Sequence, residues 1–266
     1  MIIRGLESAA KGMISLMEQN DSTANNVANV NTIGYKKQVL TFQNIYDATV
    51  VDKNLKTEEY SPIGSLSVGS KVQKLTYDFA QGAFTQTGNT FDLAIQGDGF
   101  FKIEDYKTGE MSYTRNGAFT MNSQGFLTTK DGDYVMDERN RRIRIRTNGV
   151  VMNSMKDFII SERGQIEFVN KNDRITMQKI GIFDFSNKED LRNIGGSKFV
   201  PKTGYLNPEL KAEKFVIEQG ALEMANTNIV NEMIKTISTT RNYESLSKVV
   251  KNSSDTLNEA LKIARL

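Results

Sequence analysis

Asn25-Asn26-Val27-Ala28-Asn29-Val30-Asn31-Thr32-Ile33-Gly34-Tyr35 marks the end of a helical pattern near the start of this chain. Asparagine caps helices and tolerates the left-handed backbone conformation, and Gly34 supplies a stop. We therefore expect an N-terminal helix to end within this turn and a segment of different character to follow it.

The residues before the turn carry a narrow apolar stripe. Over residues 5–30, apolar side chains recur at steps of three and four: Leu6, Ala9/Ala10, Met13, Leu16/Met17, Ala24 and Val27. This spacing, near 3.5 residues, predicts an amphipathic helix. No proline interrupts it, and no glycine follows Gly12 before the turn.

The C-terminal end repeats the stripe. From Leu222 the apolar positions are Ala225, Ile229/Val230, Met233/Ile234, Ile237, Tyr243, Leu246, Val249/Val250, Leu257, Leu261 and Ala264. No proline or glycine follows Gly220, so the pattern predicts a helix of about forty residues, a length typical of coiled coils. The alternative is a helix that packs on the chain's own core. A stripe at both ends favours a terminal pair.

The middle of the chain predicts short strands separated by turns. Residues 92–96 and 100–103 indicate strand, tight turn, strand around Gly97-Asp98-Gly99, and Asn116-Gly117 predicts a hairpin within residues 111–120. Residues 126–129 and 134–136 continue the pattern across Asp131-Gly132. We expect an all-β domain of short antiparallel strands.

The predicted fold class is α+β. Long N- and C-terminal helices form a coiled-coil-like pair, and an extended linker precedes a central all-β domain. Residues 47–74 hold few apolar positions and include Pro62, Gly64 and Gly69, which indicates the linker or arm. The expected boundaries are 1–45 for the N-terminal helix, 46–75 for the linker, 76–214 for the β domain and 215–266 for the C-terminal helix. The terminal helices can pair only if the β domain brings its two ends together.

Absent residue types narrow the chemistry. The 266 residues include no Cys, His or Trp. The usual thiolate nucleophile, imidazole base and ligands of zinc, haem and iron–sulfur sites are therefore missing. Carboxylate-only chemistry with Mg²⁺ or Ca²⁺ stays open in principle. Because no group of residues in the sequence points to such a site, we expect no catalytic residue, no metal site and no cofactor.

Charge and hydropathy give no sign of nucleic acid or membrane. The formal net charge is +2, from 34 Lys and Arg against 32 Asp and Glu. Residues 1–8 lack a basic region followed by an apolar run, so we expect no Sec-type signal peptide. No run of about 18 apolar residues predicts a membrane span. Export by a machine that cleaves no signal fits these features too.

Four blocks of the sequence resemble the flagellar basal-body rod and hook protein family. They are Ala24-Asn25-Asn26-Val27-Ala28-Asn29-Val30-Asn31-Thr32-Ile33-Gly34-Tyr35-Lys36-Lys37; Asp92-Leu93-Ala94-Ile95-Gln96-Gly97-Asp98-Gly99-Phe100-Phe101; Tyr113-Thr114-Arg115-Asn116-Gly117-Ala118-Phe119-Thr120 with Gly125-Phe126-Leu127; and Gln219-Gly220-Ala221-Leu222-Glu223-Met224-Ala225-Asn226-Thr227-Asn228 with Glu232-Met233-Ile234, Ile237 and Arg241-Asn242-Tyr243-Glu244. Ala225 departs from the family's usual serine.

The resemblance implies a non-enzymatic structural subunit. It would polymerise with copies of itself into the helical tube of the flagellar rod, which transmits torque from motor to hook. The length and residues 62–72 are most like distal-rod members, with proximal-rod or hook members as alternatives. Implied partners are neighbouring rod and hook proteins, the P and L ring proteins and the flagellar type III export apparatus. The implied location is the periplasm-spanning rod of the basal body, reached without a cleaved signal peptide.

The terminal stripes and the resemblance together give the expected assembly interface. It consists of Leu6, Met13, Met17, Asn25, Asn26, Val27, Asn29, Asn31, Gly34, Tyr35, Leu222, Asn226, Asn228, Ile229, Met233, Ile237, Tyr243, Leu246, Val250, Leu257 and Leu261. The asparagines of the N-terminal turn also fit a polar binding site, but backbone capping at a helix end is the commoner role of such residues.

Two further features allow a functional and a structural interpretation. A strand over residues 139–146 would place Ile143 and Ile145 on one face and Arg142, Arg144 and Arg146 on the other. That basic stripe suits a binding module for nucleic acid or another acidic partner, or a contact with a surrounding ring or with peptidoglycan, although a solvated strand face is the commoner case. Asp92 and Asp98 could be paired carboxylates, but their flanking glycines favour a role in the turn.

Overall fold

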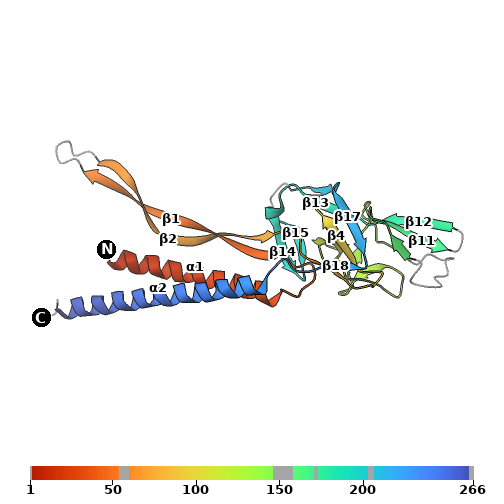
Figure 1. The fold of residues 1–266 in the computed structure, drawn as a ribbon. Helices are drawn as coiled ribbons and strands as arrows, with labels where there is room; N and C mark the ends of the chain where they lie inside the picture. Colours follow the sequence, from red (N-terminus) through yellow and green to blue (C-terminus); the bar gives the residue numbers. More distant parts are fainter. Residues whose placement is uncertain (1, 54–59, 146–157, 171–172, 203–206, 264–266) are drawn as a thin grey trace. The chain divides into compact units, whose positions relative to one another are not determined.

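A computed structural model describes residues 2–53, 60–145, 158–170, 173–202 and 207–263 (Figure 1). The helices are α1 (Ile2–Ala28) and α2 (Ile229–Ile263). The strands are β1 (Lys37–Lys53), β2 (Tyr60–Asp78), β3 (Phe84–Gln86), β4 (Leu93–Gly97), β5 (Phe100–Glu104), β6 (Met111–Thr114), β7 (Phe119–Met121), β8 (Leu127–Thr129), β9 (Tyr134–Val135), β10 (Phe158–Ile160), β11 (Gln165–Asn170), β12 (Asp173–Lys179), β13 (Ile182–Phe185), β14 (Leu191–Gly195), β15 (Lys198–Pro201), β16 (Glu209–Lys211), β17 (Phe215–Gln219) and β18 (Ala221–Glu223). The α+β class is confirmed.

The chain divides into two compact units. The helical unit consists of Met1–Ala28, Gln38–Thr76 and Asn228–Leu266, and the β unit of Asn29–Lys37 and Tyr77–Thr227. Each unit is therefore assembled from segments that are far apart in the sequence.

In the helical unit, α1 and α2 lie side by side, with the two chain ends at the same end of the pair (Figure 1). Leu246 packs against Gly12, and Asn26 bonds Glu232, so the helices run antiparallel. α1 ends at Ala28, within the asparagine-rich turn where the sequence placed its end. α2 has 35 residues against about forty expected; it begins after Asn228, whose side-chain oxygen accepts hydrogen bonds from the backbone N–H groups of Val230 and Asn231.

The segment expected to be an extended linker, residues 46–75, is extended but paired. β1 and β2 form a two-stranded sheet, the ribbon drawn in orange in Figure 1. Residues 38–45, predicted as part of the N-terminal helical region, belong to β1. Val39, Thr41, Phe42 and Ile45 are β-branched or aromatic residues, which favour strands, and this signal was missed.

The β unit is built from short antiparallel pairs. Its largest sheet has nine strands, in the order β14-β15-β6-β5-β9-β8-β7, with β13 and β16 joined beside β5. Three smaller sheets pair β10-β11-β12, β17-β4 and β18-β3. Because β17 and β18 occupy residues 215–223, the region predicted as the start of the C-terminal helix is strand. The core of the unit includes Leu93, Ile95, Phe101, Phe119 and Ile143, all essentially buried.

The predicted turns had mixed outcomes. Asp131-Gly132 joins β8 to β9 as predicted, with Thr128 opposite Tyr134. The hairpin at Asn116-Gly117 was wrong, because β6 pairs with β5 and β15 while β7 pairs with β8. A Cβ on Gly117 would lie 1.7 Å from the carbonyl oxygen of Leu93, so this glycine allows two backbones to touch. β4 and β5 form as predicted but pair with β17 and β6, not with each other.

Candidate functional site

The side of α2 that is shielded from solvent follows a seven-residue rhythm. Its buried and half-buried positions recur at steps of four and three: Glu232, Thr236, Thr239, Leu246, Val250, Ser253 and Leu257, with Tyr243 at the edge. We call these positions the inward seam. On α1 the buried side chains described are those of Ala9, Ser15, Thr23 and Asn26, and Gly12, Leu16 and Gln19 are half-buried. The inward seam therefore contains part of the predicted apolar stripe, namely Tyr243, Leu246, Val250 and Leu257, and its other positions are polar.

A second row of apolar side chains on α2 points away from α1. Val230, Met233, Ile234 and Ile237 are 59, 49, 59 and 54% exposed. Val230, Ile234 and Ile237 each precede a position of the inward seam by two residues, which is about 200° around a helix. We call these four residues the outer row. The isolated chain leaves them in contact with water.

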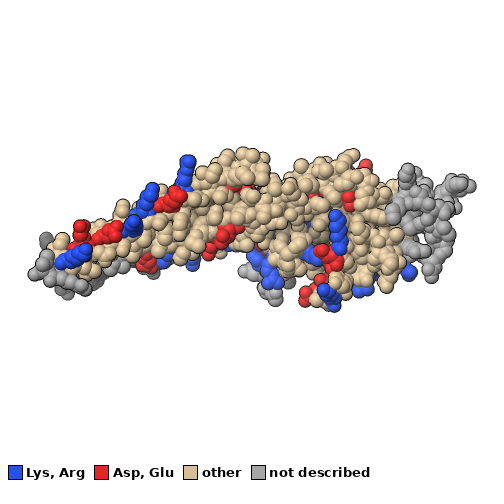
Figure 2. Space-filling model, turned by 90° about the horizontal axis from the view of Figure 1, so that it is seen from below, with Lys and Arg blue, Asp and Glu red and all other residues tan. Residues whose placement is uncertain are grey.

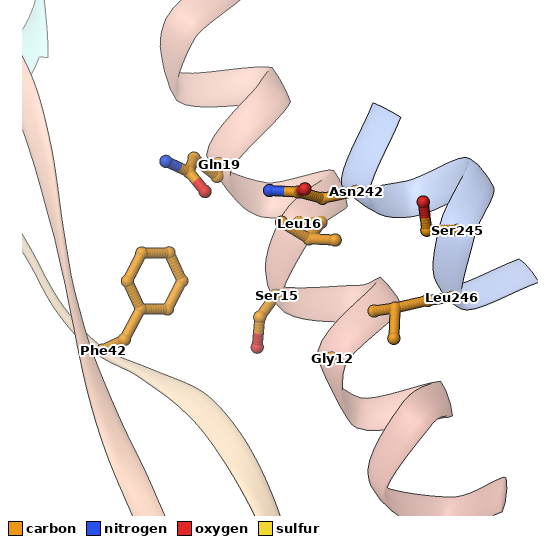
Figure 3. Close-up of a pocket in the computed structure, with 8 residues that line it drawn as sticks. All are labelled: Gly12, Ser15, Leu16, Gln19, Phe42, Asn242, Ser245 and Leu246. Atoms are coloured by element: carbon orange, nitrogen blue, oxygen red, sulfur yellow. The ribbon is translucent and has the colours of Figure 1, made fainter. Parts of the chain in front are cut away.

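Figure 3 shows a pocket of about 460 Å³ within the helical unit, beside the line where the two helices meet. Phe42 of β1 points toward α1 on one side of it, and Leu246 points toward Gly12 on the other (Figure 3). We call it the groove; its lining residues are Gly12, Ser15, Leu16, Gln19, Phe42, Asn242, Ser245 and Leu246. None of them carries a charge.

Asn26 connects the C-terminal end of α1 to the N-terminal end of α2. Its side chain is buried and bonds both backbone groups of Gln38, donating to the carbonyl at 3.0 Å and accepting from the N–H at 2.8 Å. It also donates to the buried carboxylate of Glu232 at 3.3 Å. Asn26 therefore links α1, β1 and α2 as an internal structural residue, and Asn29 bonds Thr32 within the turn that follows.

The β unit contains a buried cluster of three charged side chains. The Glu223 carboxylate accepts hydrogen bonds from the Lys36 ammonium at 2.6 Å and from the Arg115 guanidinium at 3.2 Å. The side chains of Lys36 and Glu223 are 0% exposed and that of Arg115 is 3% exposed. Burial lowers the pKa of Lys36 from its ordinary value, although the neighbouring Glu223 opposes that change.

The four sequence blocks of the flagellar resemblance meet at this cluster. Lys36 comes from the first, Arg115 from the third and Glu223 from the fourth. Arg115 also donates to the carbonyls of Ile95 and Gly97, which belong to the second. The blocks therefore have a shared structural task, which is to hold four distant segments together.

Close backbone approaches support the same cluster. Gly34 donates its N–H to the carbonyl of Glu223 at 2.8 Å, and a Cβ on Gly34 would lie 2.4 Å from the nitrogen of Asn116. Asn226 adds a second link, accepting the N–H of Lys37 and donating to the carbonyls of Asp78 and Ala80.

The basic stripe is largely engaged in internal contacts. Ile143 and Ile145 are buried as predicted, but residues 139–145 form isolated bridges and not a strand. Arg142 makes two bonds to Glu104, at 2.7 and 3.0 Å, and lies 4.3 Å from the ring of Tyr134. Its hydrogen bond holds the pKa of Glu104 below the ordinary value. Arg146 lies outside the described residues.

Asp92 and Asp98 have separate partners. Asp92 is buried and accepts from Thr87 and Asn89, while Asp98 pairs with Lys188. In the described ranges, no group of three or more acidic side chains could hold a metal ion. No helix among the described residues is long and apolar enough to cross a membrane. Figure 2 shows basic and acidic side chains alternating on the face drawn, with neither sign gathered over the helices.

The predicted interface residues fall into several environments. Met17, Asn25, Asn31, Asn228, Ile229, Met233, Ile237, Tyr243 and Leu261 are exposed; Leu6, Met13, Val27, Asn29, Asn226, Leu246, Val250 and Leu257 are half-buried; Asn26, Gly34, Tyr35 and Leu222 are buried. Asn29, Asn31, Gly34, Tyr35, Leu222 and Asn226 belong to the β unit. Sequence reasoning missed Lys36, Arg115 and Glu223, although each stands inside a block it had singled out.

Comparison with known proteins identifies the family. The description "Flagellar hook protein FlgE/F/G D1 domain" matches residues 94–168, and "Flagellar basal body rod FlgEFG protein C-terminal" matches residues 218–263.

Whole-length relatives carry related names. The flagellar basal-body rod protein FlgG of Borreliella burgdorferi is 31% identical, and that of Bacillus subtilis 29%; each alignment covers 99% of this chain and 100% of the relative. The rod protein FlgF of Caulobacter vibrioides is 33% identical over 91% of this chain and 90% of its own length. This chain therefore belongs to the family of flagellar basal-body rod proteins, the structural subunits of the rod, and is most like FlgG, with FlgF next.

Proposed function

We propose that this rod subunit polymerises through its helical unit, in which α1 and α2 form a coiled-coil-like pair. The seven-residue rhythm of the seam between them supports the pairing. The observation that carries the assembly proposal is the outer row, because four adjacent aliphatic side chains remain about half exposed in the single chain. An exposed apolar row of this kind is typical of a surface that another protein covers.

The energetics favour cooperative assembly over a stable dimer. Burying the exposed half of four aliphatic side chains gives about 3 to 6 kcal/mol, at about 1.5 to 3 kcal/mol for each full side chain. Bringing two proteins together costs about 4 to 15 kcal/mol in lost freedom of motion. One such contact therefore at best offsets its own cost and in general falls short of it. A chain that docks on the end of an existing rod makes several contacts at once, so growth from a template is favoured.

We assign the remaining parts by the same reasoning. Residues 1–28 and 228–266 would supply the assembly core, residues 38–76 the arm, and residues 29–37 and 77–227 an outer β domain that sets the spacing between subunits. The rod position that fits best is distal, which the full-length similarity to FlgG supports. The chain would act without catalysis. It would be exported by the flagellar type III apparatus without a cleaved signal, form part of a rod that spans the periplasm within the basal body, and contact neighbouring rod, hook, P-ring and L-ring proteins.

The proposal is tested by placing charges in the outer row. In the variant Met233→Asp/Ile237→Asp, two buried carboxylates would make each subunit contact unfavourable, so we expect the chain to be absent from purified basal bodies and the cells to be non-motile. The matched control is Ile194→Asp, which changes an apolar side chain of similar exposure in the β unit.

Circular dichroism of the purified variant must retain the helical signal, because both substituted positions face water in the single chain. Normal incorporation of the folded Met233→Asp/Ile237→Asp protein would refute assembly through this surface.

A further inference from the structure

We propose that the groove of one chain receives the outer row of a second copy of the same chain. This inference rests on the proposed assembly through the helical unit and adds which two surfaces meet. The groove lies among α1, α2 and β1, and the outer row lies on the side of α2 that faces away from α1. A chain cannot fill its own groove with its own outer row, so the occupant comes from another copy.

The two surfaces match in length. Along α1 the groove extends from Gly12 to Gln19, and the outer row extends from Val230 to Ile237. Each spans seven residues of helix, which is about 10.5 Å at 1.5 Å per residue. Two turns of the incoming helix therefore fit along two turns of α1.

The two surfaces are compatible in charge. Neither set contains a charged residue; the groove offers the apolar side chains of Leu16, Phe42 and Leu246 to an aliphatic row, and its polar lining residues are Ser15, Gln19, Asn242 and Ser245. Gly12 contributes no side chain, which lets Leu246 pack directly on α1 and form one wall of the groove (Figure 3). Burying the four aliphatic side chains of the outer row in the groove would therefore bury no unpaired charge.

Flanking charges indicate the direction of the contact. Exposed Glu18 stands next to Gln19 at one end of the groove, and exposed Arg241 stands one helical turn beyond Ile237. The other nearby cations are already paired, Lys11 with Glu7 and Lys235 with Glu232. Placing Arg241 beside Glu18 makes the incoming α2 run parallel to the receiving α1.

The contact joins two different surfaces, so it can repeat. Each copy would donate its outer row to one neighbour and accept the row of another in its groove. Contacts of this head-to-tail type build rings or open helical filaments, depending on the rotation between copies. The geometry of one chain therefore predicts a head-to-tail series of copies and not a two-fold dimer.

Disulfide cross-linking tests the contact directly, because the native chain contains no cysteine. Two differently tagged chains, one carrying Phe42→Cys and the other Ile234→Cys, are produced together in flagellated cells, and purified basal bodies are oxidised. We expect a mixed disulfide dimer that disappears on reduction. The control pairs Phe42→Cys with Ile14→Cys, since Ile14 is equally exposed but lies on the side of α1 away from the groove.

The outcomes separate this inference from the proposed function. The groove contact would be overturned, with rod assembly left intact, by either of two results. The basal bodies could contain both chains but yield no mixed dimer, or the control with Ile14→Cys could yield as much mixed dimer as Ile234→Cys. Absence of the chains from basal bodies, with unsubstituted chain absent as well, would overturn both. Charge reversal gives a second readout: Glu18→Lys or Arg241→Glu should each lower the cross-linked fraction, and the two together should restore it.

Discussion

Replacing Glu223 by Gln tests whether the buried charge cluster holds the β unit together. The substitution keeps the size of the side chain, so it opens no cavity. It removes the carboxylate that contacts both Lys36 and Arg115, whose side chains are 0 and 3% exposed. The amide nitrogen of glutamine cannot accept the bond that one of these cations now donates.

The expected cost follows from burial. Removing one partner of a buried ion pair costs about 3 to 5 kcal/mol, because the remaining charge stays away from water without compensation. Lys36 can relieve part of this by losing a proton, since burial already lowers its pKa. Arg115 cannot, because its guanidinium stays protonated in proteins. We therefore expect a loss of about 3 kcal/mol, which lowers the melting temperature of a unit of this size by roughly 6 to 12 °C.

The matched control is Asp98→Asn, which also changes a carboxylate to an amide but at an exposed ion pair. The side chain of Asp98 is 67% exposed, so breaking its pair with Lys188 should cost about 1 kcal/mol or less. Urea unfolding is followed by hydrogen exchange in peptides of the β unit, which separates its unfolding free energy from that of the helical unit. If Glu223→Gln costs no more than Asp98→Asn, the argument from burial is wrong.

Two further predictions concern single positions. Gly34→Ala and Gly88→Ala both place a side chain at a positive φ, 66° and 69°, and should each lose about 1 to 2 kcal/mol to backbone strain. Only Gly34 faces a backbone at 2.4 Å, so its substitution should cost about 1 to 3 kcal/mol more in denaturant unfolding; equal losses would contradict the close approach. Glu104→Gln should flatten the acid dependence of stability, because the hydrogen bond from Arg142 lowers the pKa of Glu104 below 4.5. That stabilisation is present above pH 4.5 and is lost as the pH falls through the lowered pKa of Glu104. The native chain should therefore lose more stability than the variant on acidification, by under about 1 kcal/mol because the Arg142 side chain is about half exposed. An identical pH dependence of urea midpoints would show that the pair contributes nothing.

The sequence by itself determined the local elements. The stripes over residues 5–30 and beyond Leu222 predicted two terminal helices because helical periodicity is a property of neighbouring residues. Asp131-Gly132 predicted its hairpin for the same reason, since turn chemistry depends on two adjacent residues. The resemblance blocks identified the family from residue order alone.

Only the tertiary structure decided which distant segments meet. Lys36, Arg115 and Glu223 are ordinary charged residues in the sequence, and burial of all three depends on strands whose pairing no local pattern specifies. Asn116-Gly117 has the composition of a hairpin turn, but contact with Leu93 gives it another role.

The same limit applies to the helices. A stripe of period near 3.5 specifies an apolar face, but not which partner covers it. The polar contacts of Asn26 with Gln38 and Glu232, and the packing of Leu246 on Gly12, turn one face of α2 toward α1. Val230, Ile234 and Ile237 are thereby left on the opposite face. The division of the C-terminal stripe into an inner seam and an outer row is a property of the folded helix pair, because it requires contacts between residues about two hundred positions apart.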